Sequence, residues 1–228
     1  MDLSFGRVYA RLTSSTLEEV RRLVSPGAAV VDFGTGCGRI AIPLAVEGYQ
    51  VTAVDPSPRM LDTLRSRLAT TPPDVAARVR AVHASIQSYR PDRTHQLALC
   101  VFTVIAYLLD ERSLREALAS VASSVEPGGL FLVDVPDADV FTSFDEENEQ
   151  MIRTVEIEPL EGALYGYSEH TTLRTPDGPV TYHDRFPLRR WSVEEVTEAL
   201  ARAGFQPHEN VASRFEDLGA HYLLLRRS

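Results

Sequence analysis

Lysine is missing from this sequence of 228 residues, and all 23 side chains counted as lysine plus arginine are arginines. Without a lysine ammonium the chain cannot form a Schiff base with a substrate, use lysine as a general base or hold a phosphate as the P-loop lysine does. Cysteine is scarce too, since Cys37 and Cys100 are the only two. They form neither a metal-binding pattern nor a disulfide framework, so we expect no metal centre.

Long apolar runs and an excess of positive charge are also absent. No segment approaches the roughly 18–20 consecutive apolar residues that span a bilayer, and residues 1–7 lack the pattern of a signal peptide. The formal net charge is −9 and the pI is about 5.2, so nucleic acids and acidic membrane surfaces would repel the chain. These absences predict a cytoplasmic protein without a nucleic-acid or membrane partner.

Apolar segments alternate with helical patterns up to residue 135. Short apolar runs bounded by turn residues predict strands at 28–33, 50–54, 78–82, 97–102 and 130–135. Apolar residues at helical spacing predict helices at 16–24, 38–46, 58–68 and 111–125. Such alternation is typical of a doubly wound, Rossmann-like α/β fold, in which a mostly parallel sheet carries helices on both faces.

The alternation stops after Val135. An acidic run comes first, and we interpret it as solvated. Segments rich in β-branched and aromatic residues then predict an inserted antiparallel meander, with strands at 152–157, 163–173 and 180–188.

The chain then returns to the first pattern. Ser192 and Glu195 form a capping box that predicts another helix. Two final strands are expected at 205–211 and 221–226. With the five strands predicted up to residue 135, they give the central sheet seven strands. We therefore expect one domain from residues 1–135 and 191–228, with 136–190 as an inserted subdomain.

A glycine loop connects the first strand to the next helix. Residues 32–39 read DFGTGCGR, and glycines there allow a tight turn and a close approach of a ligand to the backbone. Asp55 follows the second strand, where a carboxylate can accept hydrogen bonds from ribose hydroxyls. The two features together predict a site for a nucleoside-containing ligand.

The glycine spacing bears on which ligand is bound. A dinucleotide loop reads G-x-G-x-x-G, which would require a glycine where Arg39 stands. The glycines are instead Gly34, Gly36 and Gly38. This spacing argues against a nicotinamide-dependent oxidoreductase. That function is kept as the alternative hypothesis.

Three motifs resemble those of class I S-adenosylmethionine-dependent methyltransferases. Residues 32–39 resemble the first motif of this family, 54–61 (VDPSPRML) its acidic second motif, and 125–134 (VEPGGLFLVD) a turn and strand that recur later. The order and spacing match over roughly residues 28–135. The resemblance implies a Rossmann-like fold and transfer of the methyl group of S-adenosylmethionine to an acceptor.

The resemblance also implies the residues that bind the cofactor. The glycines would face its methionine part, Asp32 its amino group and Asp55 its ribose. The full implied set is Tyr9, Asp32, Gly34, Gly36, Gly38, Asp55, Pro56, Met60, Ser85, Ile86 and Phe102. Family members usually carry an acidic residue after the third strand, whereas residues 83–87 read HASIQ. We expect backbone groups at 84–86, with the side chain of Ser85 or Gln87, to contact the adenine instead.

The inserted segment resembles that of small-molecule methyltransferases of the glycine/sarcosine and sugar-amine types, in which added strands cover the acceptor. The resemblance therefore implies a lid over a small-molecule acceptor, and we expect an amine or hydroxyl of a specialised metabolite. A nucleophile that arrives protonated needs a base. Candidate catalytic residues are His183, Asp184 and Tyr107, with His170 and Tyr167 as further candidates. His183 and Asp184 are adjacent, so in a strand only one of them can face the site.

Other interpretations stay open at this point. A relative that binds the cofactor without methyl transfer would have the same motifs, because they do not report on the acceptor. A homodimer is compatible with the sequence.

Overall fold

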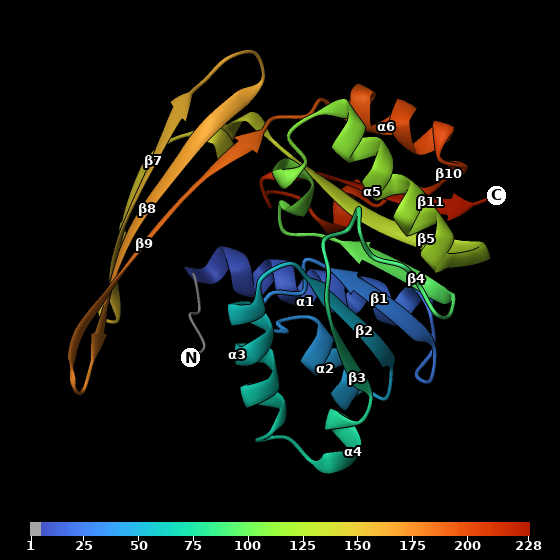
Figure 1. Ribbon diagram of the computed structural model, residues 1–228, viewed down its shortest axis with the longest axis horizontal. Helices are drawn as coiled ribbons and strands as arrows, with labels where there is room; N and C mark the ends of the chain where they lie inside the picture. Colours follow the sequence, from blue (N-terminus) through green and yellow to red (C-terminus); the bar gives the residue numbers. More distant parts are fainter. Residues whose placement is uncertain (1–5) are drawn as a thin grey trace.

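Two β-sheets make up the structure, a computed structural model that describes residues 6–228, with side chains from Ala10 on. Figure 1 shows a central sheet flanked by helices and a second sheet that stands beside it. In the part of the chain that is described, no helix is long and apolar enough to cross a membrane.

The central sheet has seven strands within residues 6–228, in the order β3–β2–β1–β4–β5–β11–β10. Their bounds are β1 Ala29–Phe33, β2 Gln50–Asp55, β3 Val79–His83, β4 His95–Cys100, β5 Val125–Pro136, β10 Phe205–Glu209 and β11 Ala220–Arg227. Strands β1 to β5 pair in parallel, whereas β11 runs antiparallel to both of its neighbours. This arrangement confirms the doubly wound, mostly parallel sheet that the sequence predicts.

Helices cover both faces of the central sheet because successive strand residues point to opposite sides. Val30 belongs to a core that includes residues of α1 (Gly6–Leu23), α2 (Ala41–Val46) and α3 (Pro58–Leu68). Val31 belongs to a second core, with residues of α5 (Glu111–Ser124) and α6 (Val193–Arg202). The short elements are α4 (Pro73–Ala76) and the 3₁₀ turns η1 (Val104–Tyr107), η2 (Ala138–Phe141) and η3 (Ala212–Arg214).

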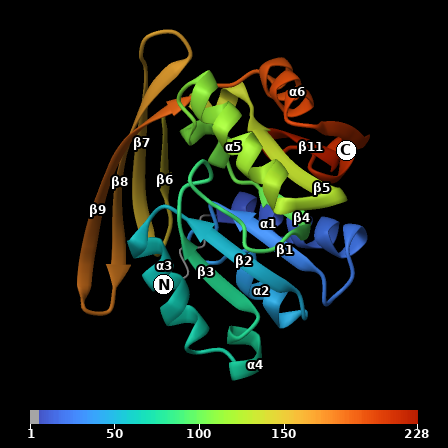
Figure 2. The same ribbon diagram turned by 45° about the vertical axis from the view of Figure 1, so that its right-hand side comes forward.

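The second sheet is antiparallel throughout, in the order β6–β7–β8–β9. Its strands are β6 Phe144–Glu147, β7 Met151–Pro159, β8 Leu164–Thr175 and β9 Gly178–Arg189. The predicted meander is thus confirmed, with β6 as a further strand formed by the acidic run. Figures 1 and 2 show this sheet on the side of the molecule to which the carboxyl ends of β4 and β5 point.

Apolar contacts attach the second sheet to the central domain. Ala106 of η1, Phe141 of η2 and Leu188 of β9 are buried against one another. Just beyond β9, the indole Nε1–H of Trp191 donates a hydrogen bond to the carbonyl oxygen of Leu108 at 2.9 Å, and the Trp191 side chain is buried. These contacts fix the end of β9 against η1, which follows β4.

Some element boundaries differ from those expected from the sequence. Helix α2 begins at Ala41 rather than at residue 38, because Gly38 has a left-handed backbone (φ +83°) that cannot start a helix. Strand β5 begins at Val125, so the Pro-Gly-Gly segment lies in the strand instead of preceding it. Helix α1 reaches back to Gly6, ten residues before the expected start, and the buried Leu12 extends its apolar stripe.

The N-terminus of α6 provides a test of the local fold. The Ser192 hydroxyl accepts a hydrogen bond from the Glu195 N–H, and the Glu195 carboxylate accepts one from the Ser192 N–H. We expect Ser192→Ala to lower the free energy of unfolding by about 1 kcal/mol, because the N–H of Glu195 loses its acceptor. Urea denaturation measures this change. Ser66→Ala, at an exposed position in the last turn of α3, is the control and should change the free energy of unfolding by less than about 0.5 kcal/mol.

Candidate functional site

The glycine loop lies at the carboxyl end of β1, where the strand order reverses. Gly34, Gly36 and Gly38 all have left-handed backbones, with φ of +73°, +54° and +83°. A Cβ atom on Gly34 would lie 2.5 Å from Val104 of η1, and one on Gly38 would lie 2.4 Å from Leu64 of α3. No described atom lies within 4 Å of the equivalent position on Gly36. The outer glycines therefore allow neighbouring elements to pack closely, while the middle one leaves its backbone open to a ligand.

Asp55, at the end of β2, holds the middle of this loop. Its Oδ2 accepts a hydrogen bond from the Gly36 N–H and its Oδ1 one from the Ser57 N–H, each at 2.8 Å. A carboxylate oxygen has a second lone pair, so each can accept one more hydrogen bond. Two neighbouring hydroxyl groups, as on a ribose, suit this arrangement. His83 Nε2 lies 3.0 Å from the Pro56 carbonyl oxygen and steadies the segment, a contact that the sequence did not indicate.

Asp32 is buried beneath the loop, with a relative exposure of 3%. Burial raises the pKa of Asp32 to about 7, and the negative charge of Asp55 raises it further in the same direction. A hydrogen bond from the Thr35 hydroxyl (2.6 Å) and the positive charge of Arg39 both act to lower this pKa. A cation bound next to Asp32 would favour its ionised form. The residue therefore suits a positively charged group of a ligand.

The end of β4 approaches the loop in an unusual conformation. Phe102 and Thr103 are consecutive non-glycine residues with φ of +67° and +64°. The Thr103 N–H donates a hydrogen bond to Oδ2 of the buried Asp134 at 2.9 Å, which helps to hold this turn. The Arg39 guanidinium carbon lies 4.2 Å from the centroid of the Phe102 ring. Strained backbone of this kind concentrates at functional sites, and here it places Phe102 beside the glycine loop.

The remaining residues expected at the cofactor site have varied surroundings. Ser85 Oγ lies 2.9 Å from Ser88 Oγ, so this hydroxyl is already engaged in a local turn. The Ile86 side chain is buried in the core on the α5 side of the sheet, so a contact of Ile86 with the adenine would have to come from its backbone. Met60, in the first turn of α3, is 45% exposed. The side chain of Tyr9 lies outside the described residues.

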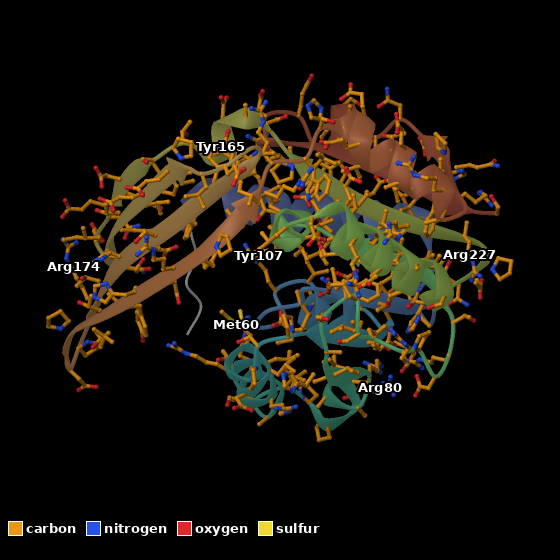
Figure 3. All side chains as sticks on the ribbon, turned by 45° about the horizontal axis from the view of Figure 1, so that its top comes forward. Met60, Arg80, Tyr107, Tyr165, Arg174 and Arg227 are labelled. Carbon is orange, nitrogen blue, oxygen red and sulfur yellow. The ribbon has the colours of Figure 1, made fainter. Side chains whose placement is uncertain are left out.

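One face of the second sheet, called the inner face below, is turned toward the central domain. The Phe186 ring of β9 has its centroid 5.2 Å from that of Tyr107 in η1. The Arg59 guanidinium carbon of α3 lies 5.3 Å from the centroid of the Tyr182 ring. Because alternate residues of a strand share a face, Asp184 also lies on the inner face. Figure 3 shows Met60 and Tyr107 on the side of the central domain that faces this sheet.

His183 lies on the opposite, outer face. Its Nδ1 is 3.0 Å from Nε2 of His170, its cross-strand neighbour, and both side chains are exposed. This position points His183 and His170 away from the glycine loop. Of the adjacent pair expected from the sequence, the geometry leaves Asp184 as the candidate base.

A partly buried polar network occupies the inner face, and its composition was not expected from the sequence. Glu169 accepts hydrogen bonds from Arg153 through both carboxylate oxygens (2.9 Å each), from the Thr171 hydroxyl (2.7 Å) and from the Tyr167 hydroxyl. Burial would raise the pKa of Glu169, but these hydrogen bonds lower it below its ordinary value. The Tyr167 ring stacks on Phe186 at 4.5 Å. The network thus fixes Tyr167 and, through it, the aromatic contact with η1.

Comparisons with known proteins agree with this geometry. Residues 30–129 match the family model of the methyltransferase domain, a range that includes the glycine loop and Asp55. A methyltransferase of Geobacillus sp. (strain WCH70) is 27% identical over 197 residues, covering 77% of this chain and 73% of the relative.

Solved structures share the fold over nearly the whole chain. An S-adenosylmethionine-dependent methyltransferase of Clostridium acetobutylicum ATCC 824 has a TM-score of 0.80 at 16% identity, over 96% of this chain and 92% of that one. The sugar N-methyltransferase KedS8 of Streptoalloteichus sp. ATCC 53650 has a TM-score of 0.73 at 21% identity, over 100% and 95%. These likenesses extend to the second sheet as well as the central domain.

The raised pKa of Asp32 predicts a pH-dependent stability. Between its ordinary pKa of 3.8 and the folded value of about 7, the folded chain holds a proton that the unfolded chain has lost. The contribution of Asp32 to the free energy of unfolding therefore falls as the pH rises through this window, by up to about 4 kcal/mol. We expect Asp32→Asn to stabilise the protein more at pH 8 than at pH 5, as measured by urea denaturation.

The exposed Asp62→Asn serves as the matched control and should change the free energy of unfolding by less than about 0.5 kcal/mol at both pH values. An effect of Asp32→Asn that is equal at pH 5 and pH 8 would contradict the assignment.

Proposed function

We propose that the protein transfers the methyl group of S-adenosylmethionine to a small-molecule acceptor, preferably an amine, because residues 30–129 match the family model of the methyltransferase domain and the chain has the class I fold. The observation that carries the proposal is the contact of Asp55 with Gly36, which sets a partly satisfied carboxylate beside the open side of the glycine loop.

The residues at the loop fit the cofactor. Each Asp55 oxygen can accept a ribose hydroxyl, and the open backbone at Gly36 can lie against the ligand. Asp32 suits a nearby cation, and Phe102 supplies an apolar surface at the end of β4. When bound, S-adenosylmethionine supplies a methyl group carried on a positively charged sulfur. Methyl transfer is an in-line displacement, so the protein contributes mainly positioning and the exclusion of water.

The acceptor is placed, in this proposal, between η1 and the inner face of the second sheet. Tyr107, Phe186 and Tyr167 form a continuous aromatic surface there, which would exclude water from an acceptor beside the end of β4. Asp184 lies on the same face and is exposed, so it can attract an ammonium and accept its proton. An amine that arrives as an ammonium must lose a proton before its nitrogen can attack, and this carboxylate can accept that proton. The shared fold with a sugar N-methyltransferase supports the preference for nitrogen.

Binding of S-adenosylhomocysteine tests the cofactor site without knowledge of the acceptor. We expect wild-type protein to bind it in isothermal titration calorimetry, and Asp55→Ala to weaken binding by about 100-fold or more, because two hydrogen bonds to a charged group are lost. Asp55→Asn, which keeps one acceptor oxygen, should weaken binding less. Asp62→Ala on exposed α3 is the control. Unchanged affinity in Asp55→Ala would place the ligand elsewhere, and binding of NADH instead would favour an oxidoreductase.

Transfer of a labelled methyl group tests the acceptor class. We expect labelled product with small amines, including amino sugars, and none with the corresponding alcohols. Asp184→Asn should lower the rate at least about 10-fold at neutral pH, because the attacking amine loses its proton acceptor. The adjacent His183→Gln, on the outer face, should leave the rate unchanged. Cofactor binding with no transfer to any amine or alcohol would identify a binding protein that does not catalyse methylation.

A further inference from the structure

Two histidines on the outer face of the second sheet have no role in the function proposed so far. We propose that His170 and His183 form a binding site for a divalent transition-metal ion that accepts imidazole ligands at right angles, such as Cu²⁺ or Ni²⁺. The pair lies on the face of the sheet that is turned away from the central domain. The inference therefore goes beyond the proposed function and does not depend on it.

The strand register brings the two imidazoles together. His170 of β8 and His183 of β9 are direct partners across the antiparallel pair. Such partners have Cβ atoms about 4.5–5.5 Å apart, so their side chains leave the sheet side by side. The ring centroids are 3.9 Å apart, and Nδ1 of His183 lies 3.0 Å from Nε2 of His170. The expectation of no metal centre rested on the cysteines, and this pair is visible only through the register of two strands.

The separation of the two nitrogens matches that of two ligands on one metal ion. A bond between Zn²⁺ and a histidine nitrogen is about 2.0–2.1 Å long, which places two such nitrogens about 3.3–3.4 Å apart at a tetrahedral angle and about 2.9 Å apart at a right angle. The observed 3.0 Å is closer to the second value, which favours the tetragonal geometry of Cu²⁺ and Ni²⁺. Both side chains are exposed and can turn about the broad χ2 torsion to direct their lone pairs at the ion.

The neighbours of the pair leave imidazole as the only ligand type. By register and alternation, Thr154 of β7, Thr172 of β8 and Thr181 of β9 lie on the same face. The hydroxyls of Thr172 and Thr181 are 3.0 Å apart and engage each other. Within the described residues, no cluster of three or more histidine, cysteine or carboxylate ligands is present. Two imidazoles suit Cu²⁺, Ni²⁺ or Zn²⁺, whereas Mg²⁺ and Ca²⁺ require oxygen ligands.

Two opposite charges flank the pair on the outer face. Glu156 of β7 and Arg185 of β9 are both aligned with Ser168, the residue two positions before His170 on β8. Glu156 attracts a cation and Arg185 repels it, and both side chains are exposed, where salt screens their charges. Their effects oppose each other, so the affinity for a metal ion depends on the two imidazole nitrogens rather than on the local charge.

Isothermal titration calorimetry of the full chain without an affinity tag, with NiCl₂ as the probe, tests this site. We expect one Ni²⁺ per chain. His170→Gln and His183→Gln should each weaken binding at least about 10-fold, because one imidazole alone lacks the gain of two ligands held together. ZnCl₂ should bind more weakly than NiCl₂, and MgCl₂ at the same concentrations should not bind. His208→Gln, at another exposed histidine, is the matched control and should bind Ni²⁺ as the wild type does.

Thermal unfolding gives a second measurement, because an ion that binds the folded state raises the unfolding midpoint. NiCl₂ should raise the midpoint of the wild type and of His208→Gln more than that of His170→Gln. A wild type that does not bind Ni²⁺, or unchanged affinity in either His170→Gln or His183→Gln, would overturn the inference. Equal weakening in His208→Gln would show binding spread over surface histidines and overturn it as well. None of these results concerns S-adenosylhomocysteine, whose binding tests the proposed function separately.

Discussion

The attachment of the glycine loop to the end of β2 is the constraint on which the site depends. The Val54 carbonyl oxygen accepts hydrogen bonds from the N–H groups of Gly34 and Thr35 at 2.8 and 3.1 Å, and Asp55 accepts that of Gly36. Because β1 and β2 are parallel neighbours, the loop after one and the carboxylate after the other meet at the same edge of the sheet. The backbone of the loop and the orientation of Asp55 therefore support each other.

Buried charge at this edge has a cost in stability that binding can offset. Burial raises the pKa of both Asp32 and Asp134 to about 7. Carboxylates with raised pKa values are common at functional sites, where a ligand or a backbone group uses them. Asp134 holds the N–H of Thr103 in a left-handed turn, and Asp32 lies near the loop where a cationic ligand would favour ionisation. The buried carboxylates that lower the stability of the fold thus lie at the same strand ends as the groups that would bind a ligand.

The two faces of the second sheet have different chemistry because they have different neighbours. On the inner face, Arg153 and Glu169 neutralise each other, and stacked rings continue from Tyr167 to η1. On the outer face, His170 and His183 are exposed. A shift of one residue in the register of β9 would exchange these faces, so the contact of Phe186 with Tyr107 also determines which polar side chains face the central domain.

Much of the central domain could be predicted from the sequence. Apolar runs, turn residues and the Ser192–Glu195 capping box report local structure, so the strands and the start of α6 were expected close to where they lie. Asp55 could be related to the glycine loop because each follows a strand of a parallel pair. The late start of α2 was not foreseen, since it depends on the left-handed backbone that Gly38 adopts against Leu64.

By itself the sequence determined the alternating fold, the glycine loop and the identity of its carboxylates, because these depend on neighbours along the chain. Only the tertiary structure decided that Asp184 rather than His183 lies on the inner face. It also decided that Arg153 meets Glu169 and that Arg39 lies over Phe102. These contacts join residues far apart in the chain, and they depend on strand register and on how the second sheet packs against η1, which local sequence patterns do not encode.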